Sequence, residues 1–358
     1  MSIVTEISPS DLRAVPEIGA VINRHGWGSL ASGVVAFPGR NDNWAGTTSA
    51  GVGVFVKKID GPDAGARFRR ALSFTRLDPV AAGIASPACI AVDEACRVLV
   101  FELLEGARDG NVLERDGLFT PATAHEAGRT VGQLHRMPAQ DQVLDTTAPS
   151  WPRLGGLNAL TMPEFTALSG AQLELFGLLQ QDAPLVDAIT GLGELSRRAP
   201  AVPTHCDLRL DQFLIHEGRL YLADWEELRK EDPARDVGAF FGEWVHRSVR
   251  AIGHSDQATA EACVSSGVRE FENRLPFLQA FWNGYQETGL VASHALAYRA
   301  TAFAGWHLLD RILAAGTERT RLSALDRASI GIARRLLCSP NAFRDVLGLS
   351  VSLQGARS

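Results

Sequence analysis

The sequence predicts a bilobal α+β chain, with a small antiparallel-sheet lobe in residues 1–105 and a mainly helical lobe in residues 106–358. A length of 358 residues exceeds what one simple core usually holds, so two lobes or domains are expected. Before Gly106, short apolar runs alternate with turn-forming residues, as in a small sheet. After Gly106, apolar residues recur mostly at helical spacing.

The N-terminal lobe is predicted to hold two helices and a small sheet. Apolar residues at helical spacing behind a Ser-Pro-Ser start indicate a first helix over 8–23, and a second helix is expected over 62–77. A tight loop over 38–44 separates the first two strands. Turn-flanked apolar runs indicate the strands, at 33–37, 44–48, 52–59, 87–92 and 97–102.

The C-terminal lobe is predicted to be a series of helices interrupted by one hairpin. Thr120, followed by a proline, is expected to begin a helix whose apolar face includes His135. A hairpin of residues 213–215 and 220–223 carries acidic residues at its ends. Further helical segments are expected at 163–198 with a break at Pro184, 237–252, 258–288 and 292–337.

The composition is that of a soluble globular protein, with 46% apolar and 21% charged residues. A formal charge of −6 argues against nucleic acid as a partner. The five cysteines are scattered without CxxC spacing, which favours reduced thiols over disulfides or a zinc site. The sequence contains neither a signal-peptide pattern nor an apolar run long enough to span a bilayer, so we expect a cytoplasmic protein without membrane contact.

Three aspartates in one region follow the order that a nucleotide-dependent phosphotransferase requires. Asp207 precedes an apolar strand, Asp224 lies 17 residues further (224 − 207) at the end of the next strand, and Asp236 lies 12 residues beyond (236 − 224). One acid orients or deprotonates the accepting hydroxyl, one holds Mg²⁺ on the triphosphate, and one braces the catalytic loop. Each alone could be a turn aspartate, but together they favour a kinase that uses Mg²⁺ with ATP or GTP.

Two adjacent lysines end the strand predicted at 52–59, and they stand out because the chain has only three lysines. Strand alternation directs Lys57 and Lys58 to opposite faces, so only one of them can face the α- and β-phosphates. The sequence VFVK matches the V-A-I-K pattern of kinase strands and favours Lys57. A solvated pair at a strand end is the plainer alternative.

Two further segments of the N-terminal lobe are candidate nucleotide contacts. The segment after the last strand, including Glu102 and Leu104, is where main-chain groups would pair with an adenine edge. The loop after the first strand can present backbone N–H groups and a guanidinium to a triphosphate, although a plain hairpin turn looks the same. Its candidate residues are Gly39, Arg40, Asn41 and Asn43.

Two histidines near these motifs are interpreted as structural rather than catalytic. His135 lies on an apolar helix face, where a histidine is usually a core residue with its hydrogen bonds satisfied. His205 is expected to support the loop that carries Asp207 through backbone contacts.

The motifs HxDxxxxQ, ADWE and DPARD, preceded by VFVKK, FELLEG and GQLHR, resemble in matching order the aminoglycoside phosphotransferase and choline kinase family. The resemblance extends over residues 33–242 and implies a protein-kinase-like fold. It implies that Asp207 is the catalytic aspartate, Asp224 the metal-binding one and Asp236 the acid that steadies the catalytic loop. Lys57 would bind phosphate, and Arg209 is grouped with Asp207 as a catalytic residue.

A narrower resemblance concerns PGRNDNWAG, VFVKK and HCDLRLDQFL, which look like segments of the phosphotransferases of class V lanthipeptide and thioamitide pathways. It implies phosphorylation of Ser or Thr in a ribosomally made precursor peptide, followed by elimination of phosphate by a separate lyase to give a dehydroamino acid. Phosphorylation turns a poor hydroxide leaving group into a good one. The implied partners are a precursor peptide, with a leader and a Ser/Thr-containing core, and a lyase.

Three positions depart from the family pattern. Gln212 stands five residues after Asp207 where Asn is usual, and its side chain still offers a carbonyl oxygen to Mg²⁺. Cys206 replaces a usual glycine, which restricts the backbone of the catalytic loop. The helix predicted at 62–77 has no glutamate to pair with the strand lysine and carries Arg69-Arg70 where an acid is expected.

Two alternatives to a peptide kinase remain open on the sequence. A kinase of a small molecule, such as an aminoglycoside-like antibiotic, would share the same motifs. A non-catalytic module of the same fold would bind a peptide and present it to a partner lyase. The second alternative is motivated by Gln212 and by the missing helix glutamate.

Overall fold

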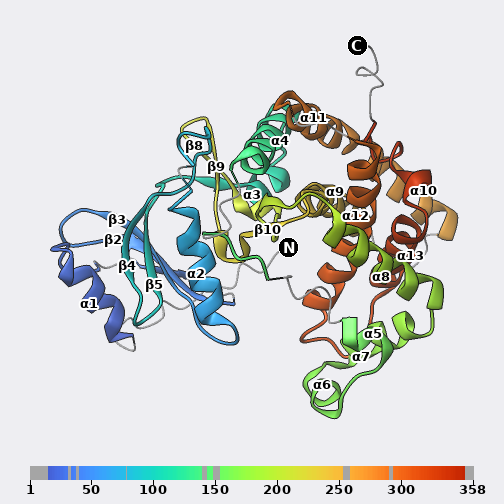
Figure 1. The fold of residues 1–358 in the computed structure, drawn as a ribbon, viewed down its shortest axis with the longest axis horizontal. Coiled ribbons are helices and arrows are strands. Elements are labelled where there is room, and N and C mark those ends of the chain that lie inside the picture. The colour runs from blue at the N-terminus through green and yellow to red at the C-terminus, as the bar shows by residue number, and fades with distance from the viewer. Residues whose placement is uncertain are drawn as a thin grey trace. The chain divides into compact units, whose positions relative to one another are not determined.

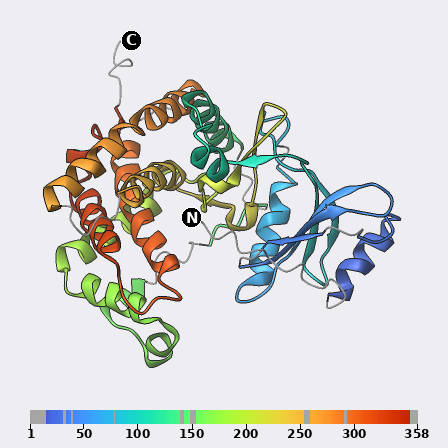
Figure 2. The same ribbon diagram turned by 180° about the vertical axis from the view of Figure 1, so that it is seen from behind.

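The computed structural model describes residues 15–30, 34–37, 40–77, 79–138, 143–147, 154–252, 259–289 and 293–350. The chain divides into two compact units. The first unit comprises Met1–Val112 and Asp211–Leu228, and the second comprises Leu113–Leu210 and Arg229–Ser358. Figure 1 and Figure 2 show the elements of both units from opposite sides.

The first unit is built on an antiparallel sheet of five strands in the order β1-β2-β3-β5-β4. Two helices, α1 (Pro16–Arg24) and α2 (Ala64–Phe74), accompany it. The strands are β1 (Val35–Phe37), β2 (Asp42–Thr47), β3 (Gly53–Lys58), β4 (Cys89–Asp93) and β5 (Val98–Glu102). The sequence predicted each of these elements, although the structure describes the predicted first helix only from Val15 onward.

The two helices pack on opposite faces of this sheet because strand residues alternate between its faces. In β5, Val98 and Val100 belong to the apolar cluster that includes Ile18 and Ile22 of α1. Leu99, between them, belongs to a second cluster formed with α2. The same alternation in β3 separates the two lysines at the end of the strand.

A second, smaller sheet of the first unit carries the predicted acidic hairpin. It has the order β6-β8-β9, with β6 (Arg108–Asp109), β8 (Phe213–His216) and β9 (Arg219–Leu222). The N–H of Leu222 donates to the carbonyl of Ala85 at 2.9 Å, and Trp225 stacks on Phe74 of α2 with ring centroids 3.5 Å apart. Because of these contacts, residues 211–228 pack with the first unit, whereas the sequence had grouped them with the helical lobe.

The second unit is mainly helical, as the sequence predicted. Two short strands, β7 (Val202–Thr204) and β10 (Arg229–Glu231), pair antiparallel before and after the segment that carries Asp207. The chain enters this unit within α3 (Gly110–Arg115). The helices are α4 (Pro121–Arg136), α5 (Leu154–Asn158), α6 (Met162–Ala167), α7 (Gly170–Gln180), α8 (Ala183–Arg198), α9 (Ala234–Arg250), α10 (Ala260–Glu272), α11 (Leu275–Glu287), α12 (His294–Ala315), α13 (Ala324–Cys338) and α14 (Pro340–Phe343).

Glycines let neighbouring helices of this unit touch backbone to backbone. A Cβ atom at Gly128 of α4 would lie 2.0 Å from the carbonyl oxygen of Phe281 in α11. A Cβ at Gly238 of α9 would lie 2.3 Å from the Cβ of Phe303 in α12. Both helix pairs lie side by side in Figure 1 and Figure 2. No helix in the described ranges has the length and apolar character needed to cross a membrane.

Candidate active site

Lys57 of β3 lies beside the acid predicted to bind a metal. Its Nζ forms an ion pair with Oδ1 of Asp224, and Oε2 of Glu226 lies 3.3 Å away. Burial alone would lower the pKa of Lys57, but the two carboxylates outweigh it and raise that pKa. Lys57 is therefore a charged ammonium held among carboxylates.

Lys58 faces the other side of the sheet, as strand alternation predicted. Its Nζ lies 2.6 Å from Glu17 of α1 and 3.6 Å from Asp60. These contacts brace α1 against the sheet and do not involve the acids around Lys57. The structure thus separates the two lysines and leaves Lys57 as the candidate for binding phosphate.

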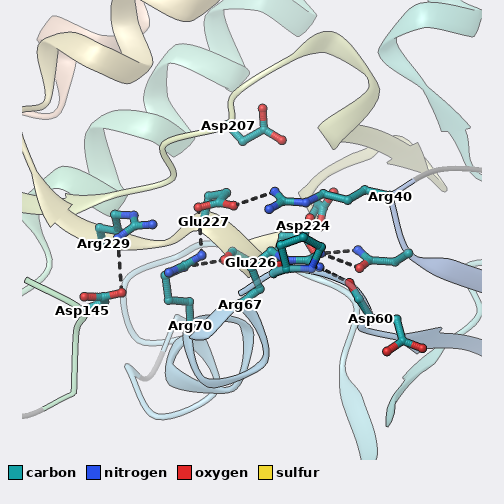
Figure 3. Close-up of polar contacts among 12 residues, drawn as sticks. Arg40, Asp60, Arg67, Arg70, Asp145, Asp207, Asp224, Glu226, Glu227 and Arg229 are labelled. Atoms are coloured by element: carbon teal, nitrogen blue, oxygen red, sulfur yellow. Dashed lines mark hydrogen bonds and ion pairs between the residues drawn. The ribbon is translucent and has the colours of Figure 1, made fainter. Parts of the chain in front are cut away.

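Glu226 is the centre of a buried polar network in the first unit (Figure 3). Its Oε2 accepts a hydrogen bond of 2.6 Å from Nδ2 of Asn41 and lies 3.5 Å from Nη1 of Arg67. The same Nη1 donates to Oδ1 of Asn41 at 2.6 Å, and Nη2 of Arg67 donates to the carbonyl of Asp60. Burial lowers the pKa of Arg67, yet a guanidinium stays protonated at neutral pH.

A second set of contacts joins the same segment to α2 and to the first loop (Figure 3). The carboxylate of Glu227 pairs with Arg70 at 3.0 Å and with Arg40 at 3.1 Å. Nε of Arg70 also donates to the carbonyl of Glu226 at 2.7 Å. The side chains of Arg40 and Asn41, predicted to contact a triphosphate, therefore contact the two glutamates in this structure.

Asn43, Glu102 and Leu104, which were also predicted to contact the nucleotide, take part in local hydrogen bonds with the backbone. Nδ2 of Asn43 donates to the carbonyl of Asn41 at 3.3 Å, so it stabilises the loop. Oε1 of Glu102 accepts a hydrogen bond from the N–H of Ala88 at 2.9 Å. The carbonyl of Leu104 accepts one from the N–H of Ala107 at 3.0 Å. Gly39 lies outside the described residues.

Asp224 has a left-handed backbone conformation, with φ at 69°, two residues after the end of β9. Aspartate tolerates this region better than most residues, and such conformations cluster at functional sites. The N–H of Ala223 donates to the carbonyl of Gln212 at 2.9 Å, which ties the two predicted metal-binding segments together. The carboxylate of Asp224 and the amide oxygen of Gln212 are hard oxygen donors, as Mg²⁺ prefers.

No group of three or more His, Cys, Asp or Glu side chains suited to a metal ion occurs within the described part of the chain. Such a group is not required for Mg²⁺ bound with a nucleotide, because that cation usually takes one or two carboxylates together with phosphates and waters. Asp224 and Gln212 therefore fit a nucleotide-bound cation better than a site made of protein ligands alone.

In the second unit, Asp236 holds the backbone of the loop that carries Asp207. Its Oδ2 accepts from the N–H of His205 at 2.7 Å, and its Oδ1 accepts from the N–H of Cys206 at 2.8 Å. Nε2 of His135 lies 3.1 Å from Oδ2, and Nδ1 of the same ring lies 2.9 Å from the hydroxyl of Tyr285. The Asp236 carboxylate thus contacts the His135 ring and the backbone of His205.

The environment of Asp236 favours its ionised form. Burial alone would raise the pKa of this carboxyl group. The hydrogen bond with His135, the nearby His205 and the backbone N–H groups outweigh burial, so the pKa lies below its ordinary value. The loop is therefore fixed by a buried, charged acceptor.

Asp207 is held by its backbone, and its side chain is partly exposed. Its N–H donates to Nδ1 of His205 at 3.4 Å, and Oδ2 of Asp207 lies 3.3 Å from Nη1 of Arg209. Cys206, where the family usually has glycine, has φ at 66°. A side chain in this region costs about 1–2 kcal/mol relative to glycine, and the two bonds from Asp236 help to hold the loop in this shape.

Sequence reasoning missed Glu226, Arg67, Arg70 and Glu227 as residues of the site. Two signals were available: an acidic pair directly after Asp224 in ADWEE, and arginines at positions 67 and 70, which share one face of a helix. The sequence showed that the helix lacks a glutamate. It did not show that a carboxylate from a distant segment lies beside Lys57.

A model of the phosphotransferase enzyme family matches residues 34–263. The chain belongs to this family. The match confirms the broader resemblance and shows that the protein is a phosphotransferase with a hydroxyl group as acceptor. No curated protein matches the chain significantly.

Solved structures show the same fold. The choline kinase LicA from Streptococcus pneumoniae has 16% sequence identity and a TM-score of 0.55, over 91% of this chain and 99% of that chain. LicA in complex with AMP has 16% identity and a TM-score of 0.53, over 90% of this chain and 98% of that chain. The predicted kinase-like α+β fold is thus confirmed.

Proposed function

We propose that this family member transfers the γ-phosphoryl group of ATP or GTP to a Ser or Thr hydroxyl of a ribosomally made precursor peptide. Lys57 would neutralise phosphate oxygens, and Asp224 with Gln212 would hold Mg²⁺. That cation supplies charge neutralisation of the triphosphate when it is bound. The contact of Lys57 with Asp224 supports this assignment, because phosphate and cation would then be held at adjacent groups.

Asp207 would orient the accepting hydroxyl toward the phosphoryl group. In a largely dissociative transfer the hydroxyl needs little activation at first, so a partly exposed aspartate suffices to position it and to take its proton late. Arg209, 3.3 Å from this carboxylate, would limit its motion and add positive charge near the transferred group.

A peptide is proposed as the acceptor because three segments resemble those of the kinases of lanthipeptide and thioamitide pathways. The segments are PGRNDNWAG, VFVKK and HCDLRLDQFL. The phosphorylated peptide would then pass to a lyase, which eliminates phosphate. A precursor peptide is available where it is translated, so we place the reaction in the cytoplasm.

The structure bears on the alternative of a non-catalytic peptide-presenting module. That alternative was motivated partly by a strand lysine without a glutamate partner. Because Glu226 lies 3.3 Å from Lys57, the missing helix glutamate does not deprive this lysine of a carboxylate. The catalytic interpretation is therefore the better supported one.

The acceptor is tested by offering precursor peptide, aminoglycosides and choline to the enzyme in parallel, each with Mg²⁺ and either ATP or GTP. We expect the peptide to gain phosphoryl groups at Ser or Thr, measured by intact mass and fragmentation. Peptides with these residues changed to Ala serve as controls. Transfer to an aminoglycoside or choline with none to peptide would replace this proposal with a small-molecule kinase.

A further inference from the structure

The charged side chains of helix α2 are unusual for a kinase-like nucleotide site. The segment AGARFRRALSF contains three arginines and no acid, so α2 cannot supply a carboxylate to Lys57. Arg67, completely buried, directs its guanidinium toward Asn41 and Glu226. The negative charge beside Lys57 comes instead from Glu226, in the segment that follows β9.

We infer that Glu226 is the positioning residue of Lys57, and that Arg67 and Asn41 fix Glu226 in that role. The inference rests on the proposed nucleotide site. Oε2 of Glu226 lies 3.3 Å from Lys57, 2.6 Å from Asn41 and 3.5 Å from Arg67, and all four residues are buried. One carboxylate oxygen thus joins the strand, the first loop and α2 around the lysine.

Asp224 contacts Lys57 as well, but it is not suited to be a permanent anchor. The proposed function assigns Asp224 to the cation, and a carboxylate bound to Mg²⁺ shares less of its charge with an ammonium. A buried lysine without a partner carries a large desolvation penalty. Glu226 keeps its contacts to Asn41 and Arg67 whether or not Asp224 binds a cation, so it can hold Lys57 in both states.

Arg67 is fixed independently of Lys57. Its Nη2 donates to the carbonyl of Asp60 and lies 3.4 Å from that of Pro62, while its Nη1 donates to Asn41. Since Arg67 is immobilised by the backbone, it restricts the position of Glu226 and, through it, that of Lys57. The arginine thus acts on the lysine through the carboxylate between them.

The test is a double-mutant cycle on nucleotide affinity, measured by titration with Mg²⁺-ADP, which needs no acceptor. Lys57→Met and Glu226→Gln are each expected to weaken binding about tenfold. The double variant should bind about as weakly as Lys57→Met alone, because Glu226 acts through Lys57. Glu94→Gln, at an exposed acid of the same unit that lies outside the site, is the matched control and should change affinity less than about twofold.

Glu226→Asp distinguishes the loss of the contact with Lys57 from a loss of folding, because the shorter side chain retains the buried charge beside Arg67 but withdraws the oxygen from Lys57. It should unfold near the wild-type temperature and still bind nucleotide more weakly. Independent losses in the cycle, or equal losses for Glu226→Gln and Glu94→Gln, would overturn the inference. A loss of affinity that excess Mg²⁺ reverses would also overturn it, because that result would identify Glu226 as a cation ligand.

A wild type that binds no nucleotide would contradict the proposed function together with the inference. Normal wild-type binding with independent losses would contradict the inference alone.

Discussion

Replacing Asp207 with Asn is expected to reduce the rate constant of phosphoryl transfer about 10²- to 10⁴-fold while leaving the fold intact. The amide is nearly isosteric with the carboxylate, and the backbone bond from residue 207 to Nδ1 of His205 does not depend on the side chain. The variant can neither take the hydroxyl proton nor hold the hydroxyl with a charged acceptor. Single-turnover transfer to acceptor, followed at saturating nucleotide, measures this rate constant.

Nucleotide affinity separates a catalytic role of Asp207 from a role in binding. We expect the Asp207→Asn variant to bind Mg²⁺-ADP within about threefold of wild type, since Lys57 and Asp224 are assigned to the nucleotide and the cation. Asp211→Asn removes another acid from the neighbouring sequence and should leave transfer nearly unchanged. Near wild-type transfer by Asp207→Asn would support the non-catalytic module instead.

Replacing Asp236 with Asn is expected to destabilise the second unit by about 3–5 kcal/mol and to abolish most activity. Asp236 is completely buried. Its carboxylate accepts hydrogen bonds from two backbone N–H groups and lies within hydrogen-bond distance of the His135 ring. Asn removes the charge and places an N–H group against a donor. Urea unfolding gives the stability, and Asp116→Asn, at an exposed acid, should change it by less than about 0.5 kcal/mol.

The effect of Asp236 should depend on pH in a defined direction. Because its native pKa lies below the ordinary value, ionised Asp236 stabilises the folded state at pH values above about 4. This contribution is lost as the pH falls through the lower native pKa. The stability difference between wild type and Asp236→Asn should therefore shrink in acid. A difference that stays constant from neutral to acid pH would show that charge is not the source of the effect.

Most of the fold could be predicted because its elements carry strong local signals. The side chain of Thr120 caps α4 by accepting a hydrogen bond from the N–H of Thr123, and Pro121 follows it, as expected for a helix start. Apolar runs between turn-forming residues predicted β3 and β5. The short strands β7 and β10 were missed, because runs of three residues that pair at a sequence separation of 25 or more (229 − 204) have little local pattern.

The site could be predicted where residue type and order carry the chemistry. Lys57 and Asp224 were assigned to adjacent roles, and the structure places them in contact. The contacts of Asp236 could be expected from its motif, whereas those of Glu226 could not. Its contacts with Lys57 and Arg67 join segments 169 (226 − 57) and 159 (226 − 67) residues apart. Such pairings depend on tertiary packing, which one sequence does not display.

The most direct test of the nucleotide site uses the scarcity of lysine in this chain. An acyl-phosphate derivative of ATP acylates a lysine amine held near its phosphates, and peptide mapping then identifies the modified position. Only Lys57, Lys58 and Lys230 are present, so two of the three are internal controls. We predict modification of Lys57 that excess Mg²⁺-ATP suppresses, with Lys58 and Lys230 insensitive to nucleotide. Modification of Lys57 that nucleotide leaves unchanged, or suppression at another lysine instead, would contradict the assignment of Lys57 to the phosphates.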